Sequence, residues 1–297
     1  MAFYSIRNLE KLSGIKAHTI RMWEKRYSIV RPRRTGTNIR YYCDDDLKRI
    51  LNVSILKRHG LKISRIAEMT DDQIAGQVMH IARTTGDHES QIEQLIVSVI
   101  EFDEDRFERT LSRGIMQLGF EETVLRVIYP FFLRIGILWQ VGTVSPAQEH
   151  FASNLIRQKL LVAIDSQDPL RKPGSRRFLL FLPEGELHEM GLLFFHYILK
   201  KHGHQVIYLG QSVPFSDLEE VIGKRNPYGL VTSFTTGLPD FSLKEYLGKL
   251  HAAFPGKKIF VTGLFAREHQ QEIPSFIEKF TCPADLISRI EAMASER

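Results

Sequence analysis

Residues 178–199, FLLFLPEGELHEMGLLFFHYIL, decide the fold of the second half of the chain. A short apolar run comes first, a polar bridge follows, and a second apolar run of helical length ends the stretch. A buried strand followed closely by a helix is the repeating unit of a parallel α/β sheet. We therefore expect a strand, a loop that carries Glu186 and His188, and a helix that begins near Gly191.

The same alternation continues along the rest of the chain. The expected strands are at 176–183, 205–210, 229–234 and 258–263, and the expected helices are at about 190–202, 215–225, 241–254 and 284–296. Alternating strands and helices with right-handed crossovers predict a flavodoxin-like, doubly wound parallel sheet over residues 176–297. Ligands bind such sheets beyond the carboxyl ends of the strands, where the loop with Glu186 and His188 is expected.

The residue types in this loop are suited to holding a metal. A neutral imidazole such as that of His188 can bind a transition metal through one ring nitrogen, while a carboxylate such as Glu186 holds the proton on the other nitrogen. A glycine at position 191 lets the backbone approach a bulky ligand. The alternative is a polar loop in which the histidine simply faces solvent.

Four amphipathic helices are predicted upstream of this sheet, within residues 88–166. The hydrophobic periodicity places them at about 89–101, 103–118, 120–138 and 145–165. Their short connections favour an up-and-down four-helix bundle. Polar residues 82–90 are expected to link the bundle to an N-terminal module, and the Pro- and Gly-containing residues 166–175 are expected to link it to the sheet.

The N-terminal part of the chain is strongly basic. The first 70 residues carry 16 Lys+Arg against 6 Asp+Glu, whereas the remaining residues carry 24 Lys+Arg against 29 Asp+Glu. A basic module attached to a mildly acidic body predicts a polyanion partner for that module. An unevenly charged surface without such a partner is the alternative.

Residues 1–75 are expected to fold as a winged helix-turn-helix. Short helices are predicted on both sides of a turn-rich stretch, 28–42, whose arginines and tyrosines favour a two-stranded wing. On the helix at 16–27, Ile20, Trp23 and Tyr27 share an inward face, which leaves the basic residues on another face. The candidate DNA-contacting residues are His18, Thr19, Arg21, Lys25, Arg26, Arg34, Arg40 and Tyr41.

Composition excludes several other classes of protein. No run reaches the roughly 20 apolar residues of a membrane-spanning helix, and the N-terminus lacks the apolar core of a signal peptide, so we expect a cytoplasmic location and no membrane partner. Cys43 and Cys282 lie too far apart in sequence for a clustered metal motif. The sequence contains no Walker phosphate loop and no G-x-G-x-x-G after a strand, which argues against nucleotide chemistry.

The N-terminal pattern resembles the winged-helix domain of the MerR family of transcription regulators over about residues 3–70. The matching segments are TIRMWEKRY, RPRRTG and RYY, together with Tyr4, Ile6, Leu9, Leu12, Ser13 and Gly14. The resemblance implies that the helix at 16–26 enters the major groove of an operator while the wing grips phosphate. Trp23 replaces the tyrosine of metal-sensing members, whose long coiled-coil helix and cysteine pair are also missing here, so metal sensing is not expected.

The loop of the sheet resembles a second family motif. Glu186-x-His188-x-x-Gly191 is similar to the D/E-x-H-x-x-G motif of cobalamin-binding domains, in which the histidine replaces the dimethylbenzimidazole base beneath the cobalt. The resemblance implies that His188 is the metal ligand and that Ser233 and Gly263 also contact the cofactor.

The predicted bundle resembles the same family. Trp139, Glu149 and His150 reproduce the W-x9-E-H spacing of the CarH and LitR group of photoreceptor regulators. The resemblance implies that the bundle covers the upper face of the corrin ring, with Trp139 near the adenosyl group of adenosylcobalamin and the Glu–His pair on the same side.

Three residues depart from the family pattern. Thr235 replaces the leucine of an S-x-L motif, Thr262 replaces the first residue of a Gly-Gly pair, and Gln140 replaces a second histidine that can capture cobalt after photolysis. The resemblance as a whole implies a transcriptional repressor whose dimer or tetramer forms with adenosylcobalamin and releases its operator in light.

Two alternatives stay open. The first is a DNA-binding regulator whose sensory domain has lost the cofactor or is controlled by a protein partner. The second is an enzyme or corrinoid carrier, which we do not expect because neither explains the basic winged helix and the chain contains no catalytic barrel.

Overall fold

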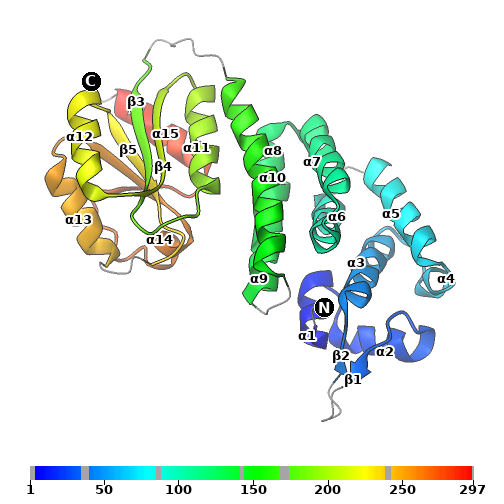
Figure 1. Ribbon diagram of the computed structural model, residues 1–297. Helices are drawn as coiled ribbons and strands as arrows, with labels where there is room; N and C mark the ends of the chain where they lie inside the picture. Colours follow the sequence, from blue (N-terminus) through cyan, green and yellow to red (C-terminus); the bar gives the residue numbers. More distant parts are fainter. Residues whose placement is uncertain are drawn as a thin grey trace. The chain divides into compact units, whose positions relative to one another are not determined.

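The computed structural model describes residues 4–34, 40–84, 88–140, 144–167, 174–237 and 242–295. The chain divides into two compact units, Met1–Ile156 and Arg157–Arg297, which are called unit 1 and unit 2 below (Figure 1). The division falls within helix α10, Pro146–Asp165. The finer division into domains at 1–75, 88–166 and 176–297 stays a prediction.

Unit 1 begins with the predicted winged helix-turn-helix. Its elements are α1 (Ile6–Ser13), α2 (Ala17–Tyr27), β1 (Arg33–Arg34), β2 (Arg40–Tyr41), α3 (Asp44–Arg58) and α4 (Ile63–Ala67). Helix α1 ends at Gly14, whose φ of 70° is accessible to glycine at little cost and whose N–H donates to the Glu10 carbonyl at 2.9 Å. Strands β1 and β2 pair antiparallel and form the wing.

The prediction that residues 82–90 form a linker is wrong for the residues that the structure describes. Helix α5 (Asp71–Thr84) includes residues 82–84 of this segment, and helix α6 (His88–Glu101) includes residues 88–90. Residues 85–87 lie outside the described part of the chain. Polar composition misled the prediction, because Ser90 is buried and Glu89 stands in the first turn of α6, where a carboxylate is favourable.

The bundle helices follow close to their predicted positions. They are α6, α7 (Glu104–Leu118), α8 (Phe120–Thr123), η1 (Val124–Ile128), α9 (Tyr129–Gln140) and α10. The single helix expected at 120–138 contains the π-helical segment η1, in which the Tyr129 N–H bonds to the Val124 carbonyl. Pro130 follows directly and has no N–H to donate, so the regular α-helical ladder cannot continue unchanged at this point.

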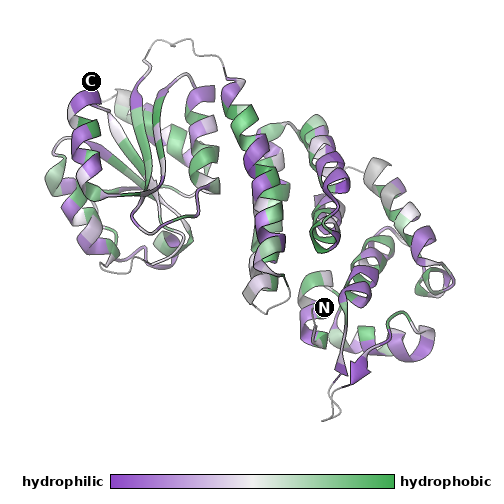
Figure 2. Ribbon diagram, viewed as in Figure 1, coloured by the Kyte–Doolittle hydropathy of each residue, from purple (hydrophilic) through white to green (hydrophobic). Residues whose placement is uncertain are grey.

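Unit 2 is the predicted doubly wound sheet. Its described strands are β3 (Arg177–Pro183), β4 (Gln205–Val213), β5 (Gly229–Ser233), β6 (Lys258–Thr262) and β7 (Glu278–Lys279), in the parallel order β4-β3-β5-β6-β7. This is the flavodoxin-like order 2-1-3-4-5. The central strands β3 and β5 are mostly apolar, and apart from Arg177 all of their residues are buried, because both faces of the sheet are covered (Figure 2).

The helices of unit 2 are α11 (Met190–Lys201), α12 (Phe215–Arg225), α13 (Leu243–Ala253), α14 (Leu264–Glu268) and α15 (Pro283–Ser295). Four of them were predicted, whereas α14 and strand β7 were missed because neither is long enough to show a hydrophobic period. Among the described residues, none of the helices has both the length and the apolarity that crossing a bilayer requires.

Candidate functional site

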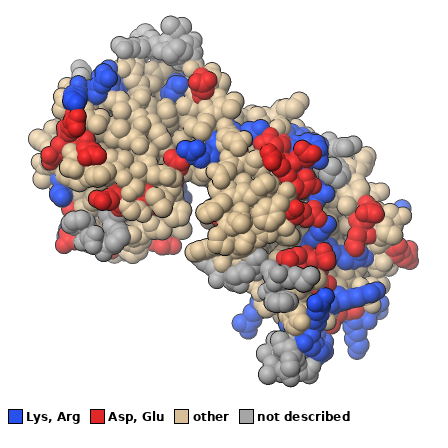
Figure 3. All heavy atoms as spheres, viewed as in Figure 1, with Lys and Arg blue, Asp and Glu red and all other residues tan. Residues whose placement is uncertain are grey.

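Helix α2 presents two different faces. Ile20 and Trp23 are buried in the module, as predicted, and Tyr27 is half-buried. The predicted DNA-contacting residues of this helix lie on the outside: His18, Arg21, Lys25 and Arg26 are exposed, and Thr19 is half-buried. Figure 3 shows lysine and arginine side chains crowded over the part of unit 1 that contains α2 and the wing. A basic, exposed helix beside a basic wing is suited to a phosphate backbone.

The wing is tied to α2 by one carboxylate. Glu24 of α2 accepts a hydrogen bond from the Arg40 Nε at 3.1 Å and another from the Tyr42 hydroxyl at 3.4 Å. Sequence reasoning assigned Arg40 to DNA and did not anticipate Glu24. The structure therefore gives Arg40 a positioning contact; its contact with DNA stays a prediction, as do those of Arg34, which is exposed, and Tyr41, which is half-buried.

The loop between β3 and α11 is organised around Glu186. One carboxylate oxygen accepts the His188 ring Nδ1–H at 2.6 Å and the His188 backbone N–H at 2.9 Å. The other accepts the backbone N–H groups of Thr235 and Thr236 at 2.8 and 2.9 Å and the Thr236 hydroxyl at 3.1 Å. Since Thr235 and Thr236 follow β5, this carboxylate joins the ends of two adjacent strands.

These hydrogen bonds fix the charge of Glu186 and the tautomer of His188. Burial alone would raise the pKa of Glu186, but the bonds from the His188 ring and from the backbone N–H groups outweigh it and lower the pKa to about 2. A carboxylate that stays ionised accepts a hydrogen bond from Nδ1–H, so in the neutral imidazole Nε2 carries the lone pair. The His188 side chain is 58% exposed.

Gly191 and Gly263, the two glycines of the predicted site, differ in the space available for a side chain. At Gly191 in the first turn of α11, an added Cβ would meet no atom within 4 Å, so the packing of this chain does not require glycine there. At Gly263, φ is 111° and an added Cβ would lie 2.1 Å from the Phe234 carbonyl oxygen. Gly263 is thus explained by the close approach of the β5 and β6 ends, and a cofactor contact there stays a prediction.

Residues at the ends of β5 and β6 line the same edge of the sheet. Ser233 and Thr262 are both buried and lie opposite each other in the parallel register. Thr235, which departs from the family pattern, contacts Glu186 through its backbone N–H. Any residue except proline offers that donor, so the departure at Thr235 leaves the Glu186 contacts intact.

Sequence reasoning missed a second carboxylate beside His188. Glu189 is buried, and it accepts hydrogen bonds from the Arg157 Nε at 2.7 Å and the Tyr208 hydroxyl at 2.8 Å. Arg157 belongs to α10 and Tyr208 to β4, so Glu189 connects the His188 loop to two further elements of unit 2. Arg157 lies 32 residues away in sequence, and no local pattern signals the pair.

The remaining predicted cofactor residues lie in unit 1. Trp139 is near the end of α9 and is 56% exposed, which is unusual for a tryptophan. Glu149 and His150 lie in the first turns of α10, where the His150 Nδ1 is 2.9 Å from a Glu149 carboxylate oxygen. The side chain of Gln140 lies outside the described residues. Because Trp139, Glu149 and His150 are in unit 1 and His188 is in unit 2, their meeting on one ligand stays a prediction.

The residues of the β3–α11 loop fit a corrinoid held by a histidine. The imidazole is exposed, its Nδ1 proton is held by an ionised carboxylate, and Gly191 in the first turn of α11 has open space on its Cβ side. These are the conditions for an axial nitrogen ligand and for close approach of a large planar ring.

Comparisons with known proteins match the N-terminal module, the bundle and most of the length of the chain. Residues 4–73 match the family "MerR HTH family regulatory protein", and residues 91–163 match the family "B12 binding domain". The chain is 30% identical over 278 residues to the HTH-type transcriptional repressor CarH of Myxococcus xanthus. The matched region spans 90% of this chain and 91% of that protein. It is 29% identical over 270 residues to the HTH-type transcriptional repressor CarA of the same organism, with coverage of 90% and 89%.

A solved structure shows a related fold. The Methanosarcina barkeri monomethylamine corrinoid protein matches with a TM-score of 0.56 at 13% identity, over 70% of this chain and all of that chain. At this identity the likeness concerns the fold alone.

Proposed function

Because the chain belongs to the family of MerR-type transcriptional repressors that includes CarH, we propose that it is a DNA-binding repressor controlled by cobalamin. The family predicted from the sequence is thereby confirmed. The observation that supports cofactor binding is the hydrogen bond between a buried, ionised Glu186 and the His188 Nδ1, which sets the tautomer that a metal-binding imidazole needs.

Each unit has its own part in this function. Helix α2 and the wing bind operator DNA, with Arg21 and Lys25 toward the major groove and Arg34 toward phosphate. In unit 2, His188 holds cobalt, and Glu186 maintains the tautomer that this requires. Trp139, Glu149 and His150 of unit 1 would contact the same cofactor. Adenosylcobalamin would supply a cobalt–carbon bond that light can break.

Oligomerisation gives the cofactor control over DNA binding. A single winged module makes few contacts with DNA, whereas two linked modules bind far more tightly because the second binds at a high effective concentration. Cofactor-bound chains associate in the dark as a dimer or tetramer, and light reverses the association.

The test compares three samples of the full chain: without cofactor, with adenosylcobalamin in the dark, and with adenosylcobalamin after green light. Size-exclusion chromatography with light scattering measures the assembly, and gel shift with genomic fragments selected by the protein measures DNA binding. We expect larger assembly and tighter binding in the dark sample alone. Equal assembly and equal binding in all three samples would contradict cofactor control.

The DNA half is tested separately by Arg21→Ala. Loss of one bidentate base contact costs about 1–3 kcal/mol, or roughly 5- to 150-fold in affinity for the selected fragment, whereas loss of a phosphate contact would weaken all sequences alike. Unchanged affinity would show that α2 does not enter the groove as proposed.

A second candidate function rests on Thr262. Its side chain is buried at the end of β6, beside the edge where a nucleotide tail would enter, and the family pattern has glycine there. In this alternative the chain represses without cofactor. Protein that stays colourless after incubation with adenosylcobalamin or hydroxocobalamin and subsequent desalting would favour it.

A further inference from the structure

Helix α6 is shared by the DNA-binding module and the bundle. Its residues 90–99 are all buried, although five of them are Ser, Gln or Glu. Helices α3 and α5 pack against it from the module, and α7, η1 and α9 pack against it from the bundle. Helix α6 is therefore in contact with both α3 and the bundle helices.

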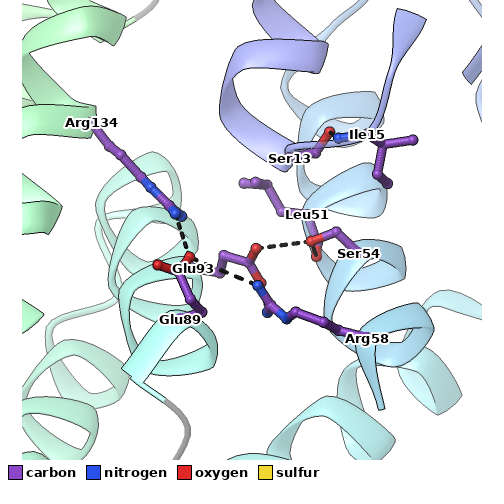
Figure 4. Close-up of polar contacts among 8 residues, drawn as sticks. All are labelled: Ser13, Ile15, Leu51, Ser54, Arg58, Glu89, Glu93 and Arg134. Atoms are coloured by element: carbon purple, nitrogen blue, oxygen red, sulfur yellow. Dashed lines mark hydrogen bonds and ion pairs between the residues drawn. The ribbon is translucent and has the colours of Figure 1, made fainter. Parts of the chain in front are cut away.

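The contact between α6 and α3 contains a buried carboxylate. The Glu93 side chain is 2% exposed, and it accepts hydrogen bonds from the Ser54 hydroxyl at 2.8 Å and the Arg58 guanidinium at 3.1 Å (Figure 4). Both donors belong to α3. Neither the helix-turn-helix nor the proposed cofactor chemistry requires an acidic group at this place.

The ionic contacts continue to α9. Arg58 also lies 3.7 Å from a carboxylate oxygen of Glu89, one turn before Glu93 on α6, and Glu89 is paired with Arg134 of α9 (Figure 4). Helix α9 carries Trp139, which is proposed to contact the cofactor. The connected groups thus run from α9 through α6 to α3.

Helix α3 also packs against α1, whose last residue is Ser13. The Leu51 carbonyl oxygen lies 2.9 Å from the Ser54 hydroxyl oxygen and is an alternative acceptor for its single proton, and Leu51 is fully buried. Figure 4 shows Leu51 between Ser54 and the turn that holds Ser13 and Ile15. In this turn the Ile15 N–H donates to the Ser13 hydroxyl at 3.2 Å, directly before the proposed recognition helix.

We propose that Arg134, Glu89, Arg58, Glu93 and Ser54, called the α9–α3 relay, transmit the state of the bundle to the DNA-binding module. This inference rests on the proposed function, because the cofactor supplies the state that is transmitted. The side chains of the relay differ in solvent exposure. Arg58 is 39% exposed and Glu89 is 45% exposed, so water can solvate both, whereas Glu93 is buried. When Glu93 is ionised, its buried charge favours keeping Arg58 beside it, because a buried charge without a partner is costly.

The experiment uses Glu93→Gln, which keeps the shape of the side chain and removes its charge. Hydrogen–deuterium exchange of residues 9–16 and 44–58 is measured in the full chain, with and without adenosylcobalamin in the dark. In the wild type we expect the cofactor to slow exchange in both segments by at least threefold. In Glu93→Gln we expect the same cofactor absorbance spectrum and no change in exchange. An unaltered exchange response in the variant would overturn the relay.

A matched control is Glu101→Gln. This change removes a surface ion pair between the same two helices, the one that Glu101 of α6 makes with Lys48 of α3. The control variant should keep the wild-type exchange response. If it loses the response as Glu93→Gln does, general weakening of the α3–α6 contact is the cause, and the relay is overturned.

A further comparison separates the relay from the proposed function. If the wild type fails to take up cobalamin, its absorbance shows that the proposed function has failed. The relay is then tested without cofactor, by comparing the exchange of residues 44–58 in Arg134→Gln, Glu93→Gln and the double variant. Coupled residues give a double variant that resembles the single ones, whereas additive effects would overturn the relay.

Discussion

Glu93 in unit 1 and Glu186 in unit 2 are both almost completely buried, yet the pKa values of their carboxyl groups move in opposite directions. Burial raises the pKa of Glu93 to about 7, against the opposing effects of Arg58, Ser54 and Arg134. At Glu186 the hydrogen bonds from His188, Thr235 and Thr236 outweigh burial and lower the pKa to about 2.

The difference follows from the donors around each carboxylate. In the described part of the chain, Glu186 accepts hydrogen bonds from three backbone N–H groups, a ring nitrogen and a hydroxyl, and the donors of Thr235 and Thr236 directly follow strand β5. Glu93 accepts from one hydroxyl and from a guanidinium that is itself partly in water. The many fixed donors keep Glu186 ionised, which suits it to orienting a ligand. Glu93 has fewer donors, so its charge changes more easily with pH.

The largest effect is expected for Glu186→Gln. An amide offers one acceptor oxygen, and its NH2 group must then face a donor, so the clamp on His188 and on the β5 end is lost. We expect the free energy of unfolding at pH 7 to fall by about 3 kcal/mol, and cobalamin to bind 10- to 100-fold more weakly. Urea unfolding and absorbance titration measure the two effects.

The matched control for that variant is Glu184→Gln, which neutralises an exposed glutamate on the same loop. It should change the free energy of unfolding by less than about 0.5 kcal/mol. Equal effects of the two substitutions would show that Glu186 is not the organising group.

The next effect is the pH dependence of stability. The ionised form of Glu186 stabilises the fold above its ordinary pKa of 4.5, and this contribution is lost as the pH falls through about 2. The contribution of Glu93 has the opposite sign: it is fully present below 4.5 and is lost as the pH rises through about 7.

Glu93→Gln should therefore stabilise the protein more at pH 8 than at pH 5, by about 1–3 kcal/mol. The charge of Arg58 does not become a buried unpaired charge in this variant, because Arg58 is partly exposed and still lies near Glu89. Urea unfolding at the two pH values makes the measurement. A gain that is the same at both values would mean that Glu93 does not titrate in this range.

The smallest effects on the free energy of unfolding are expected when one hydroxyl donor is removed, either from Glu93 or from Glu186. Ser54→Ala should raise the pKa of Glu93 further and cost about 1 kcal/mol at pH 8, because few donors remain there. Thr236→Val should cost about 0.5 kcal/mol, because Glu186 keeps its backbone donors. The two costs are read from urea unfolding, and the reverse order would contradict the donor argument.

The sequence alone predicted the parts of the fold in which apolar or charged residues repeat at regular, short spacing. The apolar strands of unit 2, the amphipathic bundle helices and the basic face of α2 all repeat within ten or twenty residues. The spacing of Glu186 and His188 was visible for the same reason, since both residues lie on one loop.

The rest depends on contacts between distant residues. Thr235 and Thr236 reach Glu186 only because β5 pairs with β3, about 50 residues away in sequence. Glu93 looks like an ordinary polar position on an amphipathic helix, and its importance appears only when α3 and α9 are packed around α6. Gly263 was assigned to a cofactor by pattern, whereas the structure explains it by the Phe234 carbonyl.

The coordination of cobalt by His188 is the central claim, and electron paramagnetic resonance tests it most directly. The full chain is prepared with 15N-labelled histidine, loaded with unlabelled adenosylcobalamin and photolysed without oxygen to cob(II)alamin. Unlabelled protein should give a three-line splitting from one axial 14N, and labelled protein a two-line splitting that is lost in His188→Ala. A three-line pattern in the labelled protein would show that the cofactor keeps its own base, and would contradict the account.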